Sequence, residues 1–258
     1  MNINNDYESA EDHYEKKEYK KALALFTQLN SREQSNDCLN YIGCCNLKLG
    51  DYHVAIEIFE RLIRQNPDWE RPVFNLGRVY LKLELNAQAL NCFKKAIIIN
   101  PNNEDGFYYL GVFYFQAGNY KTAIMYYEKS LELVFNQPET HINLGICYFK
   151  EKLYEKALEE LNVSLNLDSN DIDAMYNIGL INLILKNYKE ALNMFLKLHS
   201  QCPEDIDYIM EIVSCYCKLG DFENGSIWNN KILQLQPDHE KALLEAKKIE
   251  IRRRGNLI

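Results

Sequence analysis

Glycines recur along the chain at an interval of 34 residues. Five of the eleven glycines keep this spacing: Gly43, Gly77, Gly111, Gly145 and Gly179. Alanines repeat in the same register, twelve residues after each glycine, and four of the six prolines also follow it, at Pro67, Pro101, Pro203 and Pro237. Three residue types that share one period indicate a tandem array of short units, each of which packs against its neighbours.

Each unit carries the pattern of two short helices. In the third unit, apolar residues fall at helical spacing from Val73 to Leu83 and again from Ala89 to Ile97. Turn residues such as Gly50 and Gly118 separate the two helices of a unit. Proline can open the next helix but cannot continue the previous one. The sequence therefore predicts an all-α chain of helix-turn-helix units.

The order of small and large residues within a unit resembles the tetratricopeptide repeat family. The third unit matches it nearly throughout, with Val73, Leu76, Gly77, Tyr80, Ala89, Phe93, Ala96 and Pro101. The resemblance implies an α-solenoid, wound as a right-handed superhelix, that forms a single array over residues 1–258. Seven repeats are expected at approximately 3–35, 36–69, 70–103, 104–137, 138–171, 172–205 and 206–239, followed by a capping helix and tail at 240–258.

Composition and charge exclude several classes of partner. The chain has 29 Lys+Arg against 37 Asp+Glu, which gives a net charge of −8 and argues against nucleic-acid binding. No run of apolar residues is long enough to suggest membrane insertion. The first residues lack the basic and apolar regions of an export signal. We therefore expect a cytoplasmic protein whose eight cysteines are reduced thiols.

The sequence offers no constellation of catalytic residues, and we expect no cofactor and no metal. Cys45, Cys147 and Cys215 share one repeat position, where a buried cysteine acts as a small apolar residue. Neither Cys44 with Cys45 nor Cys215 with Cys217 has the spacing of a zinc site. Glycine-rich nucleotide-binding motifs and a nucleophile elbow are also missing from the sequence. The protein is accordingly expected not to be an enzyme.

The resemblance implies that the first helix of each repeat lines a groove that binds other proteins. Repeats three to six supply the expected binding residues, a basic corner followed by aromatic, apolar and asparagine side chains: Arg71, Asn75, Arg78, Lys82, Tyr108, Tyr109, Val112, Phe115, Asn143, Ile146, Phe149, Tyr176, Asn177, Leu180 and Leu183. An apolar strip beside a basic corner would suit an extended peptide or an amphipathic helix with an acidic end. Asparagine could also pair with a peptide backbone.

Other readings of these residues stay open. Asparagine is frequent at its repeat position in the family, and the apolar residues can be half-buried against a neighbouring helix. The lysines near the ends of the first helices, among them Lys48 and Lys82, have the sign that the helix dipole favours there. The family's co-chaperones grip a carboxylate with a lysine at the fifth repeat position, and from the second repeat on no lysine occupies it here. Chaperone tails are therefore disfavoured as partners.

The function that follows is that of a non-enzymatic adaptor or scaffold, whose concave groove binds a peptide or helix of a partner protein. One alternative is a structural subunit of a multi-protein assembly, such as a trafficking or ciliary complex, in which homo-oligomers are possible. Another is a regulatory subunit of an enzyme.

Overall fold

The computed structural model describes residues 3–255, with the side chains of residues 6–254. Within this range all regular structure is α-helical, in fifteen helices without a strand. Consecutive helices pack against each other as seven pairs, and one further helix follows them. The prediction of an all-α helix-pair solenoid with a final helix is therefore confirmed. The contacts divide the chain into an N-terminal part, Met1–Phe135, and a C-terminal part, Asn136–Ile258.

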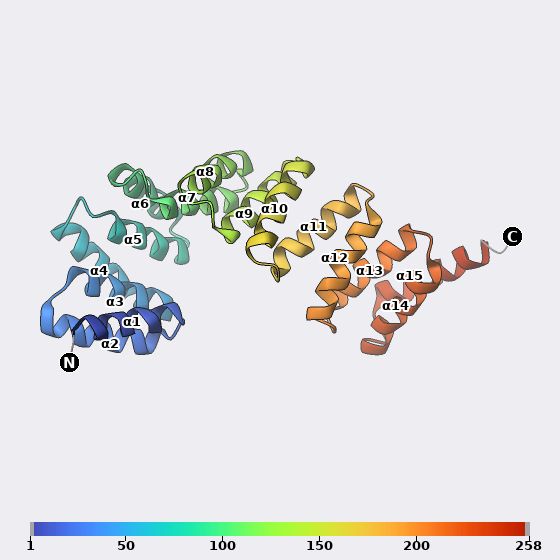
Figure 1. Ribbon diagram of the computed structural model, residues 1–258, viewed down its shortest axis with the longest axis horizontal. Helices are drawn as coiled ribbons and strands as arrows, with labels where there is room; N and C mark the ends of the chain where they lie inside the picture. The colour runs from blue at the N-terminus through green and yellow to red at the C-terminus, as the bar shows by residue number, and fades with distance from the viewer. Residues whose placement is uncertain (1–2, 256–258) are drawn as a thin grey trace. The chain divides into compact units, whose positions relative to one another are not determined.

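The N-terminal part contains four helix pairs (Figure 1). The first helices of the pairs are α1 (Ile3–Glu15), α3 (Asn36–Leu49), α5 (Glu70–Lys82) and α7 (Glu104–Gln116), and the second helices are α2 (Tyr19–Glu33), α4 (Tyr52–Gln65), α6 (Asn86–Ile99) and α8 (Tyr120–Leu133). First helices of successive pairs also contact each other, α3 with α5 and α5 with α7. Helices α3, α5 and α7 therefore form one continuous face of this part.

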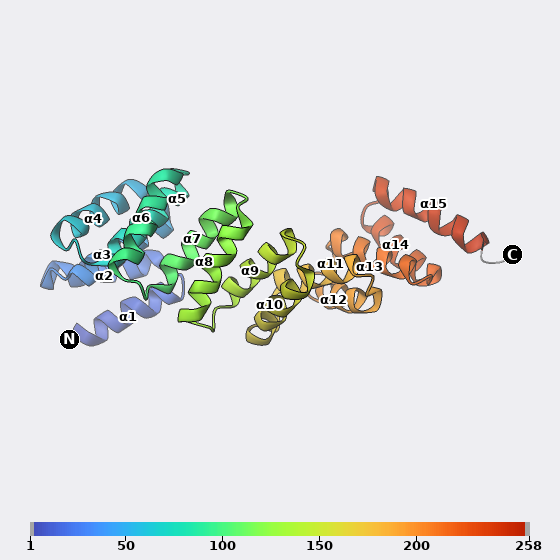
Figure 2. The ribbon, with the colours of Figure 1, turned by 90° about the horizontal axis from the view of Figure 1, so that it is seen from above.

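The C-terminal part contains three helix pairs and the final helix. The pairs are α9 (Pro138–Lys150) with α10 (Tyr154–Leu167), α11 (Ile172–Ile184) with α12 (Tyr188–Gln201), and α13 (Ile206–Lys218) with α14 (Phe222–Leu235). The final helix α15 (Glu240–Gly255) packs on α14 (Figure 2). Its Ala242 and Ile249 are buried with Ile209, Val213 and Ile232. One face of α15 thus covers the last helix pair.

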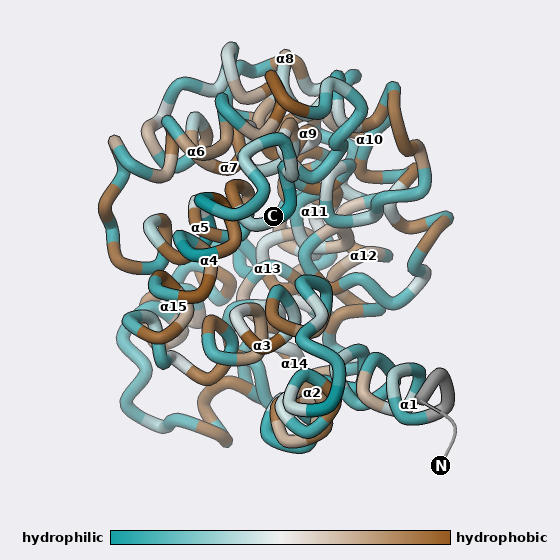
Figure 3. The backbone as a smooth tube through the Cα atoms, turned by 90° about the vertical axis from the view of Figure 1, so that its left-hand side faces the viewer, coloured by the Kyte–Doolittle hydropathy of each residue, from teal (hydrophilic) through white to brown (hydrophobic). Residues whose placement is uncertain are grey.

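None of the helices in the described range is both long and apolar enough to cross a membrane. Hydrophobic and hydrophilic segments alternate along the helices (Figure 3). This alternation is the pattern of helices that bury one side against a neighbour.

The periodic glycines lie where the two helices of a pair come closest. A Cβ atom on Gly43 would stand 2.6 Å from Phe59 Cε1, and one on Gly77 would stand 2.7 Å from Phe93 Cε1. Gly111 faces Tyr127 in the same way, at 2.5 Å from Cε1. Real Cβ atoms do not approach a packed ring so closely, because interiors are already filled to crystal-like density. Each of these three glycines therefore makes room for a buried ring of the following helix, and Gly145 makes room for Leu161 in the same way.

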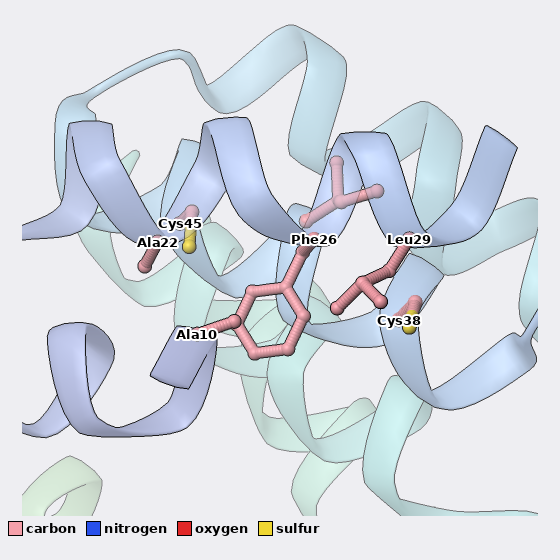
Figure 4. Close-up of a cluster of buried hydrophobic side chains, with 7 residues drawn as sticks. Ala10, Ala22, Phe26, Leu29, Cys38 and Cys45 are labelled. Atoms are coloured by element: carbon pink, nitrogen blue, oxygen red, sulfur yellow. The ribbon is translucent and has the colours of Figure 1, made fainter. Parts of the chain in front are cut away.

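Buried cysteines belong to the same packing. In the first core cluster, Cys38 and Cys45 lie beside Ala10, Ala22, Phe26 and Leu29 (Figure 4). Cys45, Cys147 and Cys215 have no exposed surface, and burial raises the pKa of each thiol to about 12. Such thiols stay protonated at neutral pH and are poor nucleophiles. Among the described residues no group of three or more His, Cys, Asp or Glu side chains could hold a metal ion.

The turn inside each helix pair contains one residue in the left-handed region. Three of these residues are glycines and four are not: Lys17 (φ 62°), Gly50 (φ 89°), Glu84 (φ 58°), Gly118 (φ 71°), Lys152 (φ 62°), Lys186 (φ 63°) and Gly220 (φ 80°). Left-handed backbone costs a residue with a side chain about 1–2 kcal/mol, whereas glycine adopts it freely. The array therefore tolerates a local cost at four of its seven turns.

Substitutions at these turns should change stability in opposite directions. We expect Lys152→Gly to raise the free energy of unfolding by up to about 1 kcal/mol, because the strain is relieved. Gly118→Ala should lower it by about 1 kcal/mol, because nothing crowds Gly118 and strain alone acts there. Urea unfolding followed by circular dichroism measures both. A destabilised Lys152→Gly variant would contradict the left-handed assignment.

Candidate functional site

A pocket of about 480 Å³ opens on the first-helix face of the N-terminal part. Helices α3, α5 and α7 supply nine of its ten lining residues, and the first residue of α4 supplies the tenth: Leu47, Lys48, Tyr52, Arg78, Leu81, Lys82, Tyr108, Tyr109, Val112 and Gln116. Three of these residues are cationic, three are tyrosines and none is acidic. We call it the basic pocket.

Arg78 is held in the wall of the basic pocket by aromatic and amide contacts. Its guanidinium carbon lies 5.7 Å from the Phe74 ring centre and 5.4 Å from the Tyr109 ring centre. These distances fit cation–π contacts. Arg78 also donates a hydrogen bond from a terminal guanidinium nitrogen to Asn75 Oδ1, at 3.1 Å. The guanidinium is therefore fixed before any partner arrives.

Asn75 has a different role from the one its repeat position suggests. The sequence predicts an amide that faces the groove and binds a peptide backbone. In the structure only 5% of Asn75 is exposed, and its Nδ2 donates to Asn40 Oδ1 of α3 at 3.1 Å. This amide therefore links α3 to α5 and positions Arg78, and it does not lie open to a partner.

Lys48 and Lys82 are the exposed cations of the basic pocket. No carboxylate in the described part of the chain forms an ion pair with Lys48, Arg78 or Lys82. The pKa of Lys48 is lowered, first by burial and then by the positive charges of Arg78 and Lys82. The pocket thus holds three cations, none of which is ion-paired with a carboxylate of the described chain.

A second pocket of about 350 Å³ shares Lys48, Arg78 and Tyr109 with the basic pocket. Its lining also contains the carboxylates of Glu15 and Asp105. Burial and then the charge of Glu104 raise the pKa of Asp105, while Arg78 opposes this shift. The lining of the second pocket is mixed in charge, which distinguishes it from the basic pocket.

The basic pocket brings together five of the predicted binding residues: Arg78, Lys82, Tyr108, Tyr109 and Val112. Arg71 is exposed near the start of α5 and lines neither pocket. Phe115 is half-buried, and its ring packs edge-on at 5.7 Å from that of Tyr120 on α8. The prediction missed five lining residues: Leu47, Lys48, Tyr52, Leu81 and Gln116.

The remaining predicted residues lie on α9 and α11 of the C-terminal part, and all of them are half-buried: Asn143, Ile146, Phe149, Tyr176, Asn177, Leu180 and Leu183. Phe149 packs on Tyr154 at 6.1 Å between ring centres. Asn177 Nδ2 donates to the carbonyl of Asp173 one turn earlier, at 2.8 Å. Part of this apolar and amide surface is therefore already used within the repeats, and a partner-binding role for it stays a prediction.

Family models match the sequence over most of its length. A model described as anaphase-promoting complex, cyclosome, subunit 3 matches residues 1–62 and 116–198, which together exceed half of the chain. Two tetratricopeptide repeat models match residues 72–103 and 92–125. The chain belongs to the tetratricopeptide repeat family. Repeats of this family are generally non-catalytic interaction modules. A comparison with curated proteins gave no match.

Solved structures share the fold. YrrB, described as a tetratricopeptide repeat protein with an unusual peptide-binding site, is 24% identical with a TM-score of 0.67, over 73% of this chain and 97% of its own. The C-terminal part of a repeat protein from Cytophaga hutchinsonii is 21% identical with a TM-score of 0.68, over 93% of this chain and 98% of its own. A chain of the APC/C hetero-tetramer Cut9–Hcn1 is 18% identical with a TM-score of 0.67. The matched region spans 93% of this chain and 48% of the chain in the tetramer.

Proposed function

We propose that this tetratricopeptide repeat chain is a non-enzymatic adaptor or scaffold that holds a segment of a partner protein on its first-helix face. The basic pocket is the observation that carries the proposal. Binding sites are typically concave and mostly apolar, with a few convergent polar groups. The pocket follows this description, because aliphatic and tyrosine side chains surround three cations.

An extended segment fits this surface better than a bulky domain. The pocket runs across three first helices, so a chain lying over it would contact successive repeats in turn. Such an arrangement spreads the binding energy over several repeats, as concave solenoid surfaces do. Within the C-terminal part, the half-buried side chains of α9 and α11 would offer apolar contacts to a segment bound there.

Changing the apolar wall of the pocket tests the proposal. Val112 is half-buried in that wall, and Val112→Glu should weaken binding about tenfold or more, because a bound segment would have to cover a charged carboxylate in place of an apolar side chain. The probes are peptides selected from a displayed random library on the full chain, measured by fluorescence anisotropy. Met125→Glu on α8 is the matched control, since Met125 is 67% exposed outside the pocket. Equal affinities for the two variants would contradict the proposal.

A second candidate function is that of a structural subunit in a multi-protein assembly. The match to the anaphase-promoting complex subunit 3 model favours it, as does the likeness to a chain of the Cut9–Hcn1 tetramer. Light scattering after size-exclusion chromatography separates the two functions. A peptide receptor should elute as a monomer, and an assembly subunit should form oligomers or co-elute with stable partners.

A further inference from the structure

We propose that the basic pocket recognises an acidic segment of its partner, in which carboxylate side chains alternate with apolar ones. This inference rests on the proposed function and adds the chemistry of the partner. Lys48, Arg78 and Lys82 would bind the carboxylates, while Tyr52, Tyr108 and the aliphatic wall would contact the side chains between them.

Charge gives the first argument. The whole chain carries a net charge of −8, yet no carboxylate lines this pocket and none in the described part pairs with its three cations. A positive site without paired carboxylates attracts acidic segments and repels basic ones. Burial first, and then the positive charges of Arg78 and Lys82, lower the pKa of Lys48, and a bound anion would offset the repulsion between these three cations.

The distribution of the cations gives the second argument. Lys48 stands on α3, while Arg78 and Lys82 stand one turn apart on the same side of α5. Leu47, Leu81 and the tyrosines lie in the same wall as these charges. A lining in which charged and apolar groups are interspersed matches a segment with the same interspersion. A segment that concentrates its charge on one or two phosphates would leave part of this interspersed lining without a matching group.

The fixed position of Arg78 gives the third argument. Binding loses affinity when flexible side chains must be ordered, and Arg78 is already held by Phe74, Tyr109 and Asn75. A planar guanidinium held in this way can donate two parallel hydrogen bonds to one carboxylate. Arg78 therefore acts as the anchor, and the two lysines extend the site along the bound segment.

Three synthetic peptides of about twelve residues test the inference on the full chain by fluorescence anisotropy. The first alternates glutamate with leucine, and the second has glutamine at each glutamate. The third carries the same total charge on phosphoserines, with glutamine at the other acidic positions. We expect the glutamate peptide to bind about tenfold more tightly than the glutamine peptide, and more tightly than the phosphopeptide.

Variants of the chain then locate the binding site. Lys48→Gln combined with Lys82→Gln should weaken binding of the glutamate peptide about tenfold and reduce its dependence on salt. Lys94→Gln combined with Lys95→Gln makes the same change of charge on exposed residues of α6, and should leave the affinity unchanged. Far-ultraviolet circular dichroism establishes that both double variants remain folded.

Several results would overturn the inference. These are equal binding of the glutamate and glutamine peptides, tighter binding of the phosphopeptide, and equal losses in the two double variants. If library-selected peptides respond to Val112→Glu but not to the Lys48/Lys82 change, the proposed function stands and this inference fails. If those peptides respond to neither change, the proposed function fails as well.

Discussion

Replacing Gly111 by leucine is expected to lower the free energy of unfolding by about 1–3 kcal/mol, toward the upper end of that range. Already the first added atom, the Cβ, would stand 2.5 Å from Tyr127 Cε1 and 2.6 Å from Cδ1. Tyr127 has no exposed surface, so its ring has no free space into which to move. The α7–α8 pair must therefore separate to admit the new side chain. Urea unfolding followed by circular dichroism measures the loss.

Ala117→Leu provides the matched control for this prediction. Ala117 is exposed immediately after the end of α7, so the same side chain is added there without entering the core. We expect its stability to stay within about 0.5 kcal/mol of the unmodified chain. If Gly111→Leu unfolded at the same urea concentration as this control, the close packing of α7 on α8 would be wrong.

Phe93→Ala should have the largest effect of the substitutions considered, a loss of about 3–5 kcal/mol in the free energy of unfolding. Phe93 has no exposed surface and fills the space against Gly77. Its ring centre lies 6.0 Å from that of Phe74 and 5.5 Å from that of Tyr109, the two rings that hold Arg78. Truncation therefore creates a cavity directly behind the basic pocket.

The variant should lose partner binding as well as stability, because Phe74 and Tyr109, the rings that hold Arg78, lose the side chain on which they pack. Urea unfolding and anisotropy with library-selected peptides measure the two effects separately. Ile98→Ala on the same helix is the control, since Ile98 is 77% exposed and its truncation opens no cavity. Unchanged peptide affinity in a folded Phe93→Ala variant would show that the rings do not support the site.

The fold could be predicted from the sequence because the same pattern of small and large packing residues recurs in successive repeats. A lone glycine is ambiguous, but Gly43, Gly77 and Gly111 in one register indicate a recurring close approach of two helices. The structure shows the partner of each approach, a buried ring of the second helix such as Phe59 or Phe93. Local propensity, period and packing agree, which is why the helix pairs follow from the pattern.

The site was less accessible to sequence reasoning because it depends on side chains from three repeats that converge. The helix dipole explains why Lys48 and Lys82 each lie near the end of a helix. It does not predict that both lysines line one pocket with Arg78. Asn75 occupies a groove position in the repeat register, yet its side chain is bonded to Asn40 and joins α5 to α3. Repeat position alone does not distinguish an open amide from one already bonded to a neighbour.

The turns inside the helix pairs, too, could be predicted only in part from residue type. The glycines at 50, 118 and 220 mark turns in the sequence, whereas Lys17, Glu84, Lys152 and Lys186 adopt the same left-handed conformation without such a signal. The packing of the two helices in a pair imposes this conformation on whichever residue stands at the turn. The repeat register, and not residue propensity, locates these four turns.

Site-specific photo-crosslinking tests most directly the central claim that the first-helix face of the N-terminal part holds a partner protein. A photoreactive amino acid is placed either at Gln116, an exposed residue that lines the basic pocket, or at Met125 on α8 outside it. We expect crosslinks to a partner from position 116 that disappear with Val112→Glu, and none from position 125. Crosslinks that form only from position 125 would contradict it.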